Sequence, residues 1–214
     1  MQFAAFAARA AELEAESGDL ATVAAVSDLF CDAGADLPVV ARFLQGRVFP
    51  AWDATTIDVG PALLHEAIAR AAGPNVDADD VEARLAEVGE IGAVAASYDF
   101  GGQRGLGAFG GGDSGGGTDG DSGGGTDRDG GGTSGNDEDL TVREVDDRLA
   151  EIATASGDGS ERRRLDVLFG LFNRASPEEA KFLARLVLGE MRIGVGEGTV
   201  RDAIAAAFLD DGGV

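Results

Sequence analysis

Apolar residues recur at intervals of three and four positions on either side of the middle of the chain. One such face consists of Phe3, Phe6, Ala7, Ala10 and Leu13, and a later one of Leu165, Leu168, Phe169 and Phe172. This spacing predicts amphipathic helices with one buried side. The alternation of apolar and polar residues that is typical of strands is absent. We therefore expect an all-α protein of about ten or more helices.

Capping residues predict two of the helix starts. Thr141 is followed three positions later by Glu144, and Ser176 is followed by Pro177 and Glu179. A hydroxyl at the cap and a glutamate three residues on can each accept a hydrogen bond from the other's backbone N–H. Helices are therefore expected to begin directly after Thr141 and Ser176.

The middle of the chain has a different composition. Residues 101–135 include 18 glycines, and the octapeptide GDSGGGTD occurs twice in tandem, at 112–119 and 120–127. A segment this rich in Gly, Asp and Ser is typical of a flexible linker. We expect residues 101–139 to link a first helical half, residues 1–100, to a second, residues 140–214.

A short internal repeat relates the two halves. Residues 57–69 align without gaps with residues 193–205, and six of the thirteen are identical. Each copy follows an expected helix end near a glycine, Gly46 or Gly189. The repeat predicts two similar units related by a pseudo-twofold axis, with His65 on an exposed face because it aligns with Arg201. Chance similarity between alanine-rich helices is the alternative.

Composition limits the class of protein. The 214 residues are 44% hydrophobic, which suffices for a core. Cys31 is the only cysteine and His65 the only histidine, so neither an intrachain disulfide nor a Cys/His metal cluster can form. No apolar run approaches the roughly 20 residues that span a bilayer, and the amino end carries acids where a secretion signal is basic. We expect a cytoplasmic protein without a membrane partner.

Charge is unevenly distributed. The chain has 39 acidic and 17 basic residues, a formal net charge of -22, and a single lysine, Lys181. Such an acid-rich composition is typical of proteins that stay soluble in concentrated salt, so we expect a halophilic source. Residues 160–201 differ, with eight basic and six acidic residues. One local surface is therefore expected to be basic.

A glycine-rich turn lies within this basic segment. Gly194, Gly196 and Gly198 alternate with other residues before an expected helix, between Arg192 and Arg201. The bare N–H groups of a helix start can bind an anion. Nucleotide-binding loops need a preceding strand and a different glycine spacing. What remains is a structural turn, or N–H groups held against a nucleic-acid phosphate.

A second glycine-led helix start occurs at residues 156–164. Ser160 is placed to cap it, and three arginines then occupy the first turn, where the helix dipole favours acids. A bound phosphate would explain this arrangement. The alternative is a solvated face in which Glu161 offsets the arginines. Two such starts favour DNA, held by backbone contacts that do not read its sequence.

Together these segments resemble the N-terminal DNA-binding domain of ATP-dependent DNA ligases of archaea and eukaryotes. The resemblance runs through residues 44–50, 59–64, 89–95, 156–160, 175–185 and 188–197. It implies an all-α, pseudo-twofold domain that binds nicked duplex DNA without sequence specificity. The implied DNA contacts are Gly157, Ser160, Arg163, Arg164, Arg192, Gly194, Gly196 and Thr199, with Gly60 as a weaker candidate.

The nucleophile of these ligases has no counterpart here. It is the lysine of a Lys-x-Asp-Gly motif, whereas Lys181 is followed by Phe-Leu-Ala. We therefore expect no catalytic residue, metal ligand or cofactor in this chain, and no nick sealing by it alone. The resemblance implies that ATP and Mg²⁺ serve a full-length ligase with adenylation and OB domains, acting in replication and repair.

The expected linker contains a possible docking motif. Gln103, Leu106 and Phe109 fit the pattern Q-x-x-L-x-x-F by which replication proteins bind the sliding clamp, although Gly110 replaces the usual second aromatic. The alternative is a linker with two incidental apolar residues. A competing function for the whole chain is accordingly an all-α interaction module that docks on the clamp without binding DNA.

Overall fold

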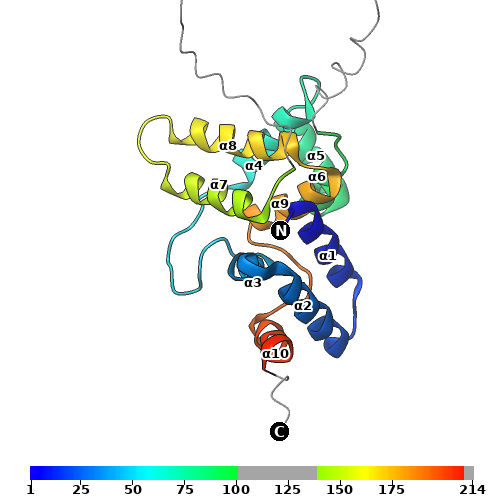
Figure 1. Cartoon of the computed structure of the whole chain (residues 1–214). Helices are drawn as coiled ribbons and strands as arrows, with labels where there is room; N and C mark the ends of the chain where they lie inside the picture. Colours follow the sequence, from blue (N-terminus) through cyan, green and yellow to red (C-terminus); the bar gives the residue numbers. More distant parts are fainter. Residues whose placement is uncertain (101–138, 210–214) are drawn as a thin grey trace, which may run out of the picture.

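A computed structural model describes residues 1–100 and 139–209, and these residues form helices without a strand (Figure 1). The all-α prediction is confirmed. The elements are α1 (Phe3–Ala15), α2 (Asp19–Ala33), the 3-10 turn η1 (Gly34–Asp36), α3 (Leu37–Leu44), α4 (Pro61–Ala72), α5 (Ala78–Val88), α6 (Ile91–Ala96), α7 (Val142–Thr154), α8 (Ser160–Arg174), α9 (Pro177–Val187) and α10 (Glu197–Phe208). None of these described helices is long and apolar enough to cross a membrane.

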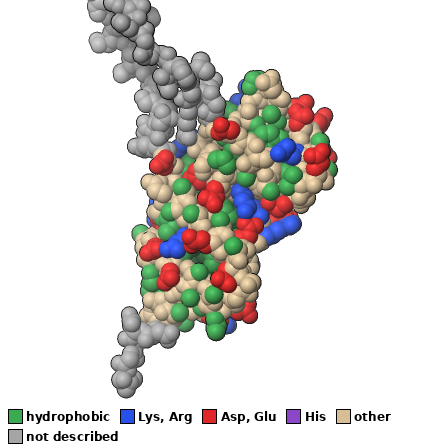
Figure 2. All heavy atoms as spheres, turned by 90° about the vertical axis from the view of Figure 1, so that its right-hand side faces the viewer, with side chains coloured by type: hydrophobic (Ala, Val, Ile, Leu, Met, Phe, Trp, Pro, Cys, Tyr) green, Lys and Arg blue, Asp and Glu red, His purple; other side chains and the backbone are tan. Residues whose placement is uncertain are grey.

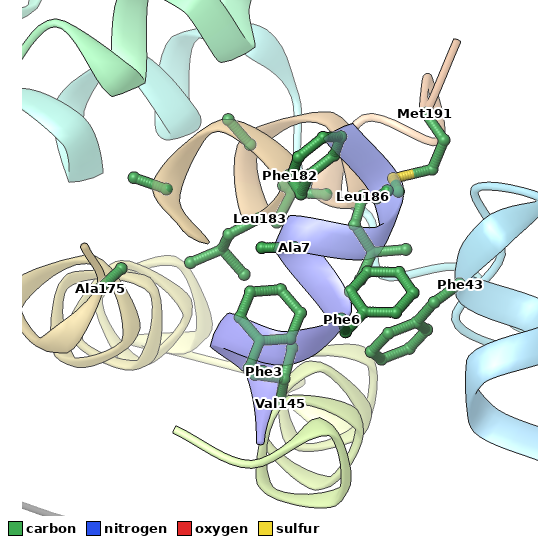
Figure 3. Packing of buried hydrophobic residues seen from close by; sticks show 14 of the residues in the cluster. Phe3, Phe6, Ala7, Phe43, Val145, Ala175, Phe182, Leu183, Leu186 and Met191 are labelled. Carbon is green, nitrogen blue, oxygen red and sulfur yellow. The ribbon is translucent and has the colours of Figure 1, made fainter. Parts of the chain in front are cut away.

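Helix α1 lies at the centre of the core (Figure 3). All five residues of its predicted apolar face are buried. The ring of Phe6 stacks on Phe3 with centroids 5.6 Å apart and meets the ring of Phe43 edge-on at 5.9 Å. Val145 of α7 and Phe182 of α9 are buried in the same cluster, so one core joins the two halves of the chain.

The predicted helix starts are found, with one correction. Thr141 Oγ1 accepts a hydrogen bond from Glu144 N–H at 3.1 Å, and Ser176 and Glu179 form a reciprocal capping box. Ser160 was expected to cap α8, but it is the first residue of that helix and Gly159 is the cap. The turn before α8 is left-handed at Gly159, so the chain enters helical geometry one residue earlier than expected.

Backbone bonds near the amino end reveal the pseudo-twofold axis. Gln2 and Thr141 form an antiparallel bridge, in which Phe3 N–H donates to Leu140 O at 2.7 Å and Val142 N–H donates to Met1 O at 3.0 Å. A twofold rotation that exchanges the two halves of the chain also exchanges these two hydrogen bonds. Matching helices also have equal lengths, because α1 and α7 have 13 residues, α2 and α8 have 15, and α4 and α10 have 12.

The two predicted glycines meet at the axis. Gly46 and Gly189 follow α3 and α9 with φ of 70° and 69°. A Cβ on Gly46 would lie 2.8 Å from Gly189 O, and one on Gly189 would lie 3.4 Å from Gly46 O. The positive φ favours glycine at both positions, and the close approach of the two backbones requires it at Gly46. The repeat is therefore structural and not a chance similarity.

The helix that ends each repeat packs against the other half of the chain. Helix α4 packs against α8, and α10 packs against α2. The expectation that His65 is exposed is wrong, because only 8% of this residue is accessible. Helix α4 is covered by α8 and also by α5, whereas the repeat partner Arg201 on α10 is exposed. Helices α4 and α10 are therefore equivalent in the repeat, but different segments of the chain cover them.

Candidate nucleic-acid interface

The start of α10 has backbone donors without acceptors. Gly196 is its cap residue, and no side chain caps the helix. Val200 N–H donates to Gly196 O at 3.0 Å, but the N–H groups of Glu197, Gly198 and Thr199 have no acceptor among the described residues. Thr199 is half-buried. An uncapped helix start carries a partial positive charge and suits an anion such as a phosphate.

The glycines before and within this start face open space. A Cβ built on Gly194, Gly196 or Gly198 would meet no atom within 4 Å. Gly194 has φ 72°, so its backbone conformation favours glycine, but neither conformation nor packing demands glycine at Gly196. Open space above bare N–H groups leaves room for an external group to approach the backbone.

Arg192 has a strained backbone in the same loop. Its φ is 53°, a left-handed conformation that costs a non-glycine residue about 1–2 kcal/mol. The side chain is 60% exposed and bonds to Glu190 Oε2 at 2.6 Å. Strain retained at an exposed, charged position is typical of functional sites.

The start of α8 repeats several of these features. Gly157 and Gly159 both have φ 78°, and a Cβ on either would meet nothing within 4 Å. Ser160 is half-buried at the first position of the helix. Arg162 and Arg163 are exposed and have no ion-pair partner in the described part of the chain. The predicted second start is thus glycine-led, uncapped and cationic.

Arg164 lies differently from its two neighbours. It donates to Asp58 Oδ2 at 3.0 Å, to Asp58 O at 3.2 Å and to Ala155 O at 3.0 Å, and its side chain is only 17% exposed. It therefore joins the start of α8 to the loop before α4, next to Gly60. A phosphate could reach Arg164 only by displacing Asp58.

Sequence reasoning missed Asp58, although the repeat contained a signal for it. Asp58 aligns with Gly194 and, like it, is left-handed, with φ 48°. Gly60, the weaker predicted contact, is the cap residue of α4; no side chain caps this helix, and a Cβ on Gly60 would meet nothing within 4 Å. Pro61 follows it and has no N–H to offer.

Acids accompany most other arginines near these loops. Arg47 bonds to Glu197 Oε1 at 3.2 Å, and Arg201 bonds to Asp202 Oδ1 at 2.9 Å. Figure 2 shows Lys and Arg side chains lying beside Asp and Glu side chains on one face of the molecule. The described residues include no group of three His, Cys, Asp or Glu side chains that could hold a metal ion. The bare N–H groups and the exposed arginines of these loops could therefore bind an anion at contact distance.

Comparison with known proteins agrees with these features. The family described as DNA ligase N terminus matches residues 2–105 and 128–205 of the chain. This chain belongs to that family. The match to the DNA ligase N terminus includes all three helix starts described above, at α4, α8 and α10.

Whole ligases are similar over the same region. The chain is 66% identical over 209 residues to the DNA ligase of Haloferax volcanii, which covers 98% of this chain and 32% of that protein. It is 62% identical to the DNA ligase of Natronomonas pharaonis and 39% identical to that of Methanosphaerula palustris, covering 97% of this chain in both cases. The chain thus spans about a third of the length of these relatives, two of which come from haloarchaea as the charge predicted.

The predicted clamp motif lies outside the described residues. Gln103 falls within the family match, which pauses after residue 105 and resumes at residue 128, so Leu106 and Phe109 are not part of it. Lys181, the only lysine, lies on α9 and bonds to Glu14 of α1. Its helical position agrees with the predicted match to a helix of the DNA-binding domain.

Proposed function

We propose that this chain binds nicked duplex DNA, without reading its sequence, as the N-terminal part of an ATP-dependent DNA ligase. The observation that supports this most is the pair of uncapped helix starts at α8 and α10. Left-handed Gly157 and Gly159 precede α8 and left-handed Gly194 precedes α10, all three with open space outside them, and each start has an exposed arginine beside it. Phosphate contacts of this kind give affinity and position but no sequence preference.

Short-range bonding suits the charge of the chain. The formal net charge of -22 repels DNA at long range, so distant attraction contributes little. The Debye length falls to about 3 Å at 1 M salt, where charges act only over contact distances. Backbone N–H groups and arginines that touch a phosphate remain effective there, because a hydrogen bond depends on contact.

The other steps of ligation belong to the longer protein in this proposal. Nick sealing in the cytoplasm would use ATP and Mg²⁺ bound to adenylation and OB domains. About two thirds of the length of the relatives lies outside the matched region and could contain these domains. The role of this chain is to hold the DNA on which those domains act.

A fluorescence-anisotropy titration tests the proposal. Labelled nicked duplex, intact duplex of the same sequence and single-stranded DNA are each titrated with the chain across a salt series. We expect the nicked duplex to bind most tightly, with affinity that falls as salt rises. Equal or absent binding of all three DNAs would contradict the proposal.

A matched pair of arginine variants locates the site. Arg192→Ala removes an exposed arginine from the α10 loop and is expected to weaken binding about tenfold, the loss of a charge-assisted bond to phosphate. Arg84→Ala removes an arginine from α5 that bonds to Ser97 Oγ at 2.7 Å, outside these loops. Its affinity should match that of the unmodified chain. Similar losses in both variants would indicate a general charge effect.

Docking on the sliding clamp stays a separate prediction. It depends on Gln103, Leu106 and Phe109 alone. If the motif acts, Phe109→Ala should lower clamp affinity in a titration and leave DNA affinity unchanged. Unchanged clamp affinity would contradict it.

A further inference from the structure

The pseudo-twofold axis shows where one face of the molecule is uncovered. In the first repeat, α5 packs on α4 and α6 packs along α9. The axis relates α4 to α10 and α9 to α3. Figure 1 shows α5 and α6 at the end of the molecule beside α4, and α10 at the opposite end beside α2 and α3. No described segment occupies, on α10 and α3, the place that α5 and α6 occupy on α4 and α9.

A groove of about 540 Å³ lies at that place. Its lining includes two residues of α3 and the cap residue that follows it, and α10 supplies the opposite side. Pro38 and Arg42 of α3 and its cap residue Gln45 correspond to Lys181 and Arg185 of α9 and its cap residue Leu188 when Gly46 is paired with Gly189. A shared hydrogen bond fixes this correspondence, because Arg42 Nε donates to Val48 O at 2.8 Å and Arg185 Nη1 donates to Met191 O at 3.3 Å.

Helix α6 touches these positions in the first repeat. A Cβ on Gly92 of α6 would lie 2.8 Å from Lys181 O and 2.9 Å from Arg185 Nε. The backbone of α6 therefore lies directly on α9, and glycine makes that contact possible. Glu90 caps α6 and bonds to Arg185 Nε at 3.0 Å. The counterpart surface on α3 is the floor of the groove.

Burial differs between the counterpart helices. Ile68 of α4 is fully buried, whereas the matching Ile204 of α10 is only half-buried; the other pair, Leu64 and Val200, is buried in both helices. Large apolar side chains around the groove are exposed, with Trp52 89% and Leu209 71% accessible. An exposed apolar patch of this kind on a folded chain marks an interaction surface.

We infer that this groove docks a second helix pair with the chemistry of α5 and α6. Within that pair, the helix that contacts α3 is short and consists of small apolar residues, with glycine at the contact and a carboxylate at its start. That carboxylate would face Arg42, the counterpart of Arg185, beside its present partner Asp146. Arg47 and Arg201, which also line the groove, bond to Glu197 and Asp202. The longer ligases that this chain matches have about two thirds of their length to supply such a pair. The inference stands apart from the proposed DNA binding, since it rests on the symmetry of the fold.

A graft tests the inference on the full chain. A copy of residues 77–98, which contain α5 and α6, is appended after Val214, so that residues 209–214 take the place of the loop between α4 and α5. We expect amide hydrogen exchange in α10 to slow at least about tenfold, since a docked helix raises its local stability. Trp52, the only tryptophan, should shift its emission to shorter wavelength as the groove closes.

The matched control carries one substitution in the appended copy. The copy of Gly92 is changed to Leu, which would clash with the backbone of α3 as it would with Lys181 O in α9. Exchange and emission should then equal those of the ungrafted chain. Equal protection by both grafts, or by neither, would overturn the inference. A dimer of the ungrafted chain that Ile204→Asp abolishes in sedimentation would also overturn it, because the occupant would then be a second copy.

Discussion

The loop before α4 and the loop before α10 occupy equivalent places in the repeat and have different chemistry. Each has a left-handed residue two positions before the cap glycine, Asp58 with φ 48° and Gly194 with φ 72°. In the first loop the carboxylate of Asp58 bonds to Arg164, whereas the second loop has no side chain at this position. The first loop therefore has its own anion, and the second leaves its N–H groups bare.

This difference shows how one repeated fold can yield two unequal anion sites. In the loop before α4, Asp58 already neutralises the charge of Arg164. A phosphate bound there would therefore gain less electrostatic stabilisation. The α10 start has no acid two residues before its cap, although Glu190 bonds to Arg192 and Glu197 lies in the first turn of the helix. We expect α10 to contribute more to DNA affinity than α4, and the following predictions test that asymmetry and the framework that supports it.

The largest expected effect concerns the paired arginines of the two repeats. Arg185 is buried and bonds to Glu14 Oε1 at 2.8 Å and to Glu90 Oε1 at 3.0 Å, whereas Arg42 is partly exposed and bonds to Asp146 Oδ2 at 2.7 Å. Arg185→Met should lower the free energy of unfolding by about 3–5 kcal/mol, because it leaves Glu90 without its cation and Glu14 with Lys181 alone.

Arg42→Met is the matched variant, and its expected cost is about 1–3 kcal/mol, the value of hydrogen bonds to a charged group. Urea denaturation of both variants and the unmodified chain measures the difference. Equal losses would show that the two repeats hold their arginines with equal strength, and the proposed structural asymmetry would then be wrong.

Acid should weaken the Arg185 network. Burial alone would raise the pKa of Glu90, but hydrogen bonds from Arg185, Gly92 N–H and Ala93 N–H outweigh it and lower that pKa below its ordinary value. A carboxyl with a lowered folded pKa stabilises the fold above its unfolded pKa of about 4.3, and this contribution is lost as pH falls through the folded pKa.

The pH dependence can be read from Glu90→Gln. This variant should be less stable than the unmodified chain at pH 7, and this difference in stability should narrow at acidic pH, below the unfolded pKa of about 4.3 and through the lower folded pKa of Glu90. Urea midpoints at each pH measure the gap. The exposed Glu82→Gln on the same hairpin serves as the control, with no gap expected at either pH. A gap that stays constant on acidification would count against the role of the ionised Glu90.

Gly196→Asp would give the second loop an anion of its own. Aspartate at a cap position stabilises a helix start by only about 0.3 kcal/mol relative to glycine. The same carboxylate would repel a phosphate from the bare N–H groups, so DNA affinity should fall about tenfold. Unfolding and fluorescence anisotropy are measured on the same sample of the variant. We expect its free energy of unfolding to rise and its DNA affinity to fall.

Gly60→Asp is the control for that experiment, because Gly60 caps α4 without a side-chain bond, as Gly196 caps α10. It should stabilise the fold similarly and change DNA affinity less than about threefold. Equal losses of affinity in the two variants would mean that both helix starts hold the DNA alike.

The smallest expected effect comes from Asp58→Gly. It makes the first loop resemble the second, relieves the positive φ and releases Arg164 toward a phosphate. DNA affinity should rise about two- to fivefold, since exposed ion pairs are worth little and the gain is correspondingly small. Asp166→Asn, which releases Arg70 on another surface, provides the comparison in the same titration. An equal rise in both variants would point to net charge alone.

Much of the fold followed from local sequence patterns. The spacing from Phe3 to Leu13 predicted the buried face of α1, and the capping residues at Thr141 and Ser176 predicted two helix starts, because these signals lie within one or two turns. The burial of His65 could not be predicted in this way, since it depends on how α5 packs over α4. The repeat suggested symmetry and gave no information on where that symmetry breaks.

The candidate site likewise contains residues that could be predicted from the sequence and a contact that could not. Gly194, Gly196, Gly157 and Arg192 could be selected from their positions in glycine-rich helix starts. The inward position of Arg164 depends on Asp58, which is more than a hundred positions away in the sequence. Contacts between distant segments leave no local pattern, so this pairing had to come from the structure.

The central claim is that the bare N–H groups at the start of α10 hold a phosphate of nicked DNA. Amide chemical shifts in ¹⁵N-labelled chain, followed as nicked duplex is added, test it most directly. The account predicts large, saturable shifts at Glu197, Gly198 and Thr199, with smaller ones at Ala62 and Leu63 in α4. Saturable binding that leaves the amides of the α10 start unmoved would contradict the account.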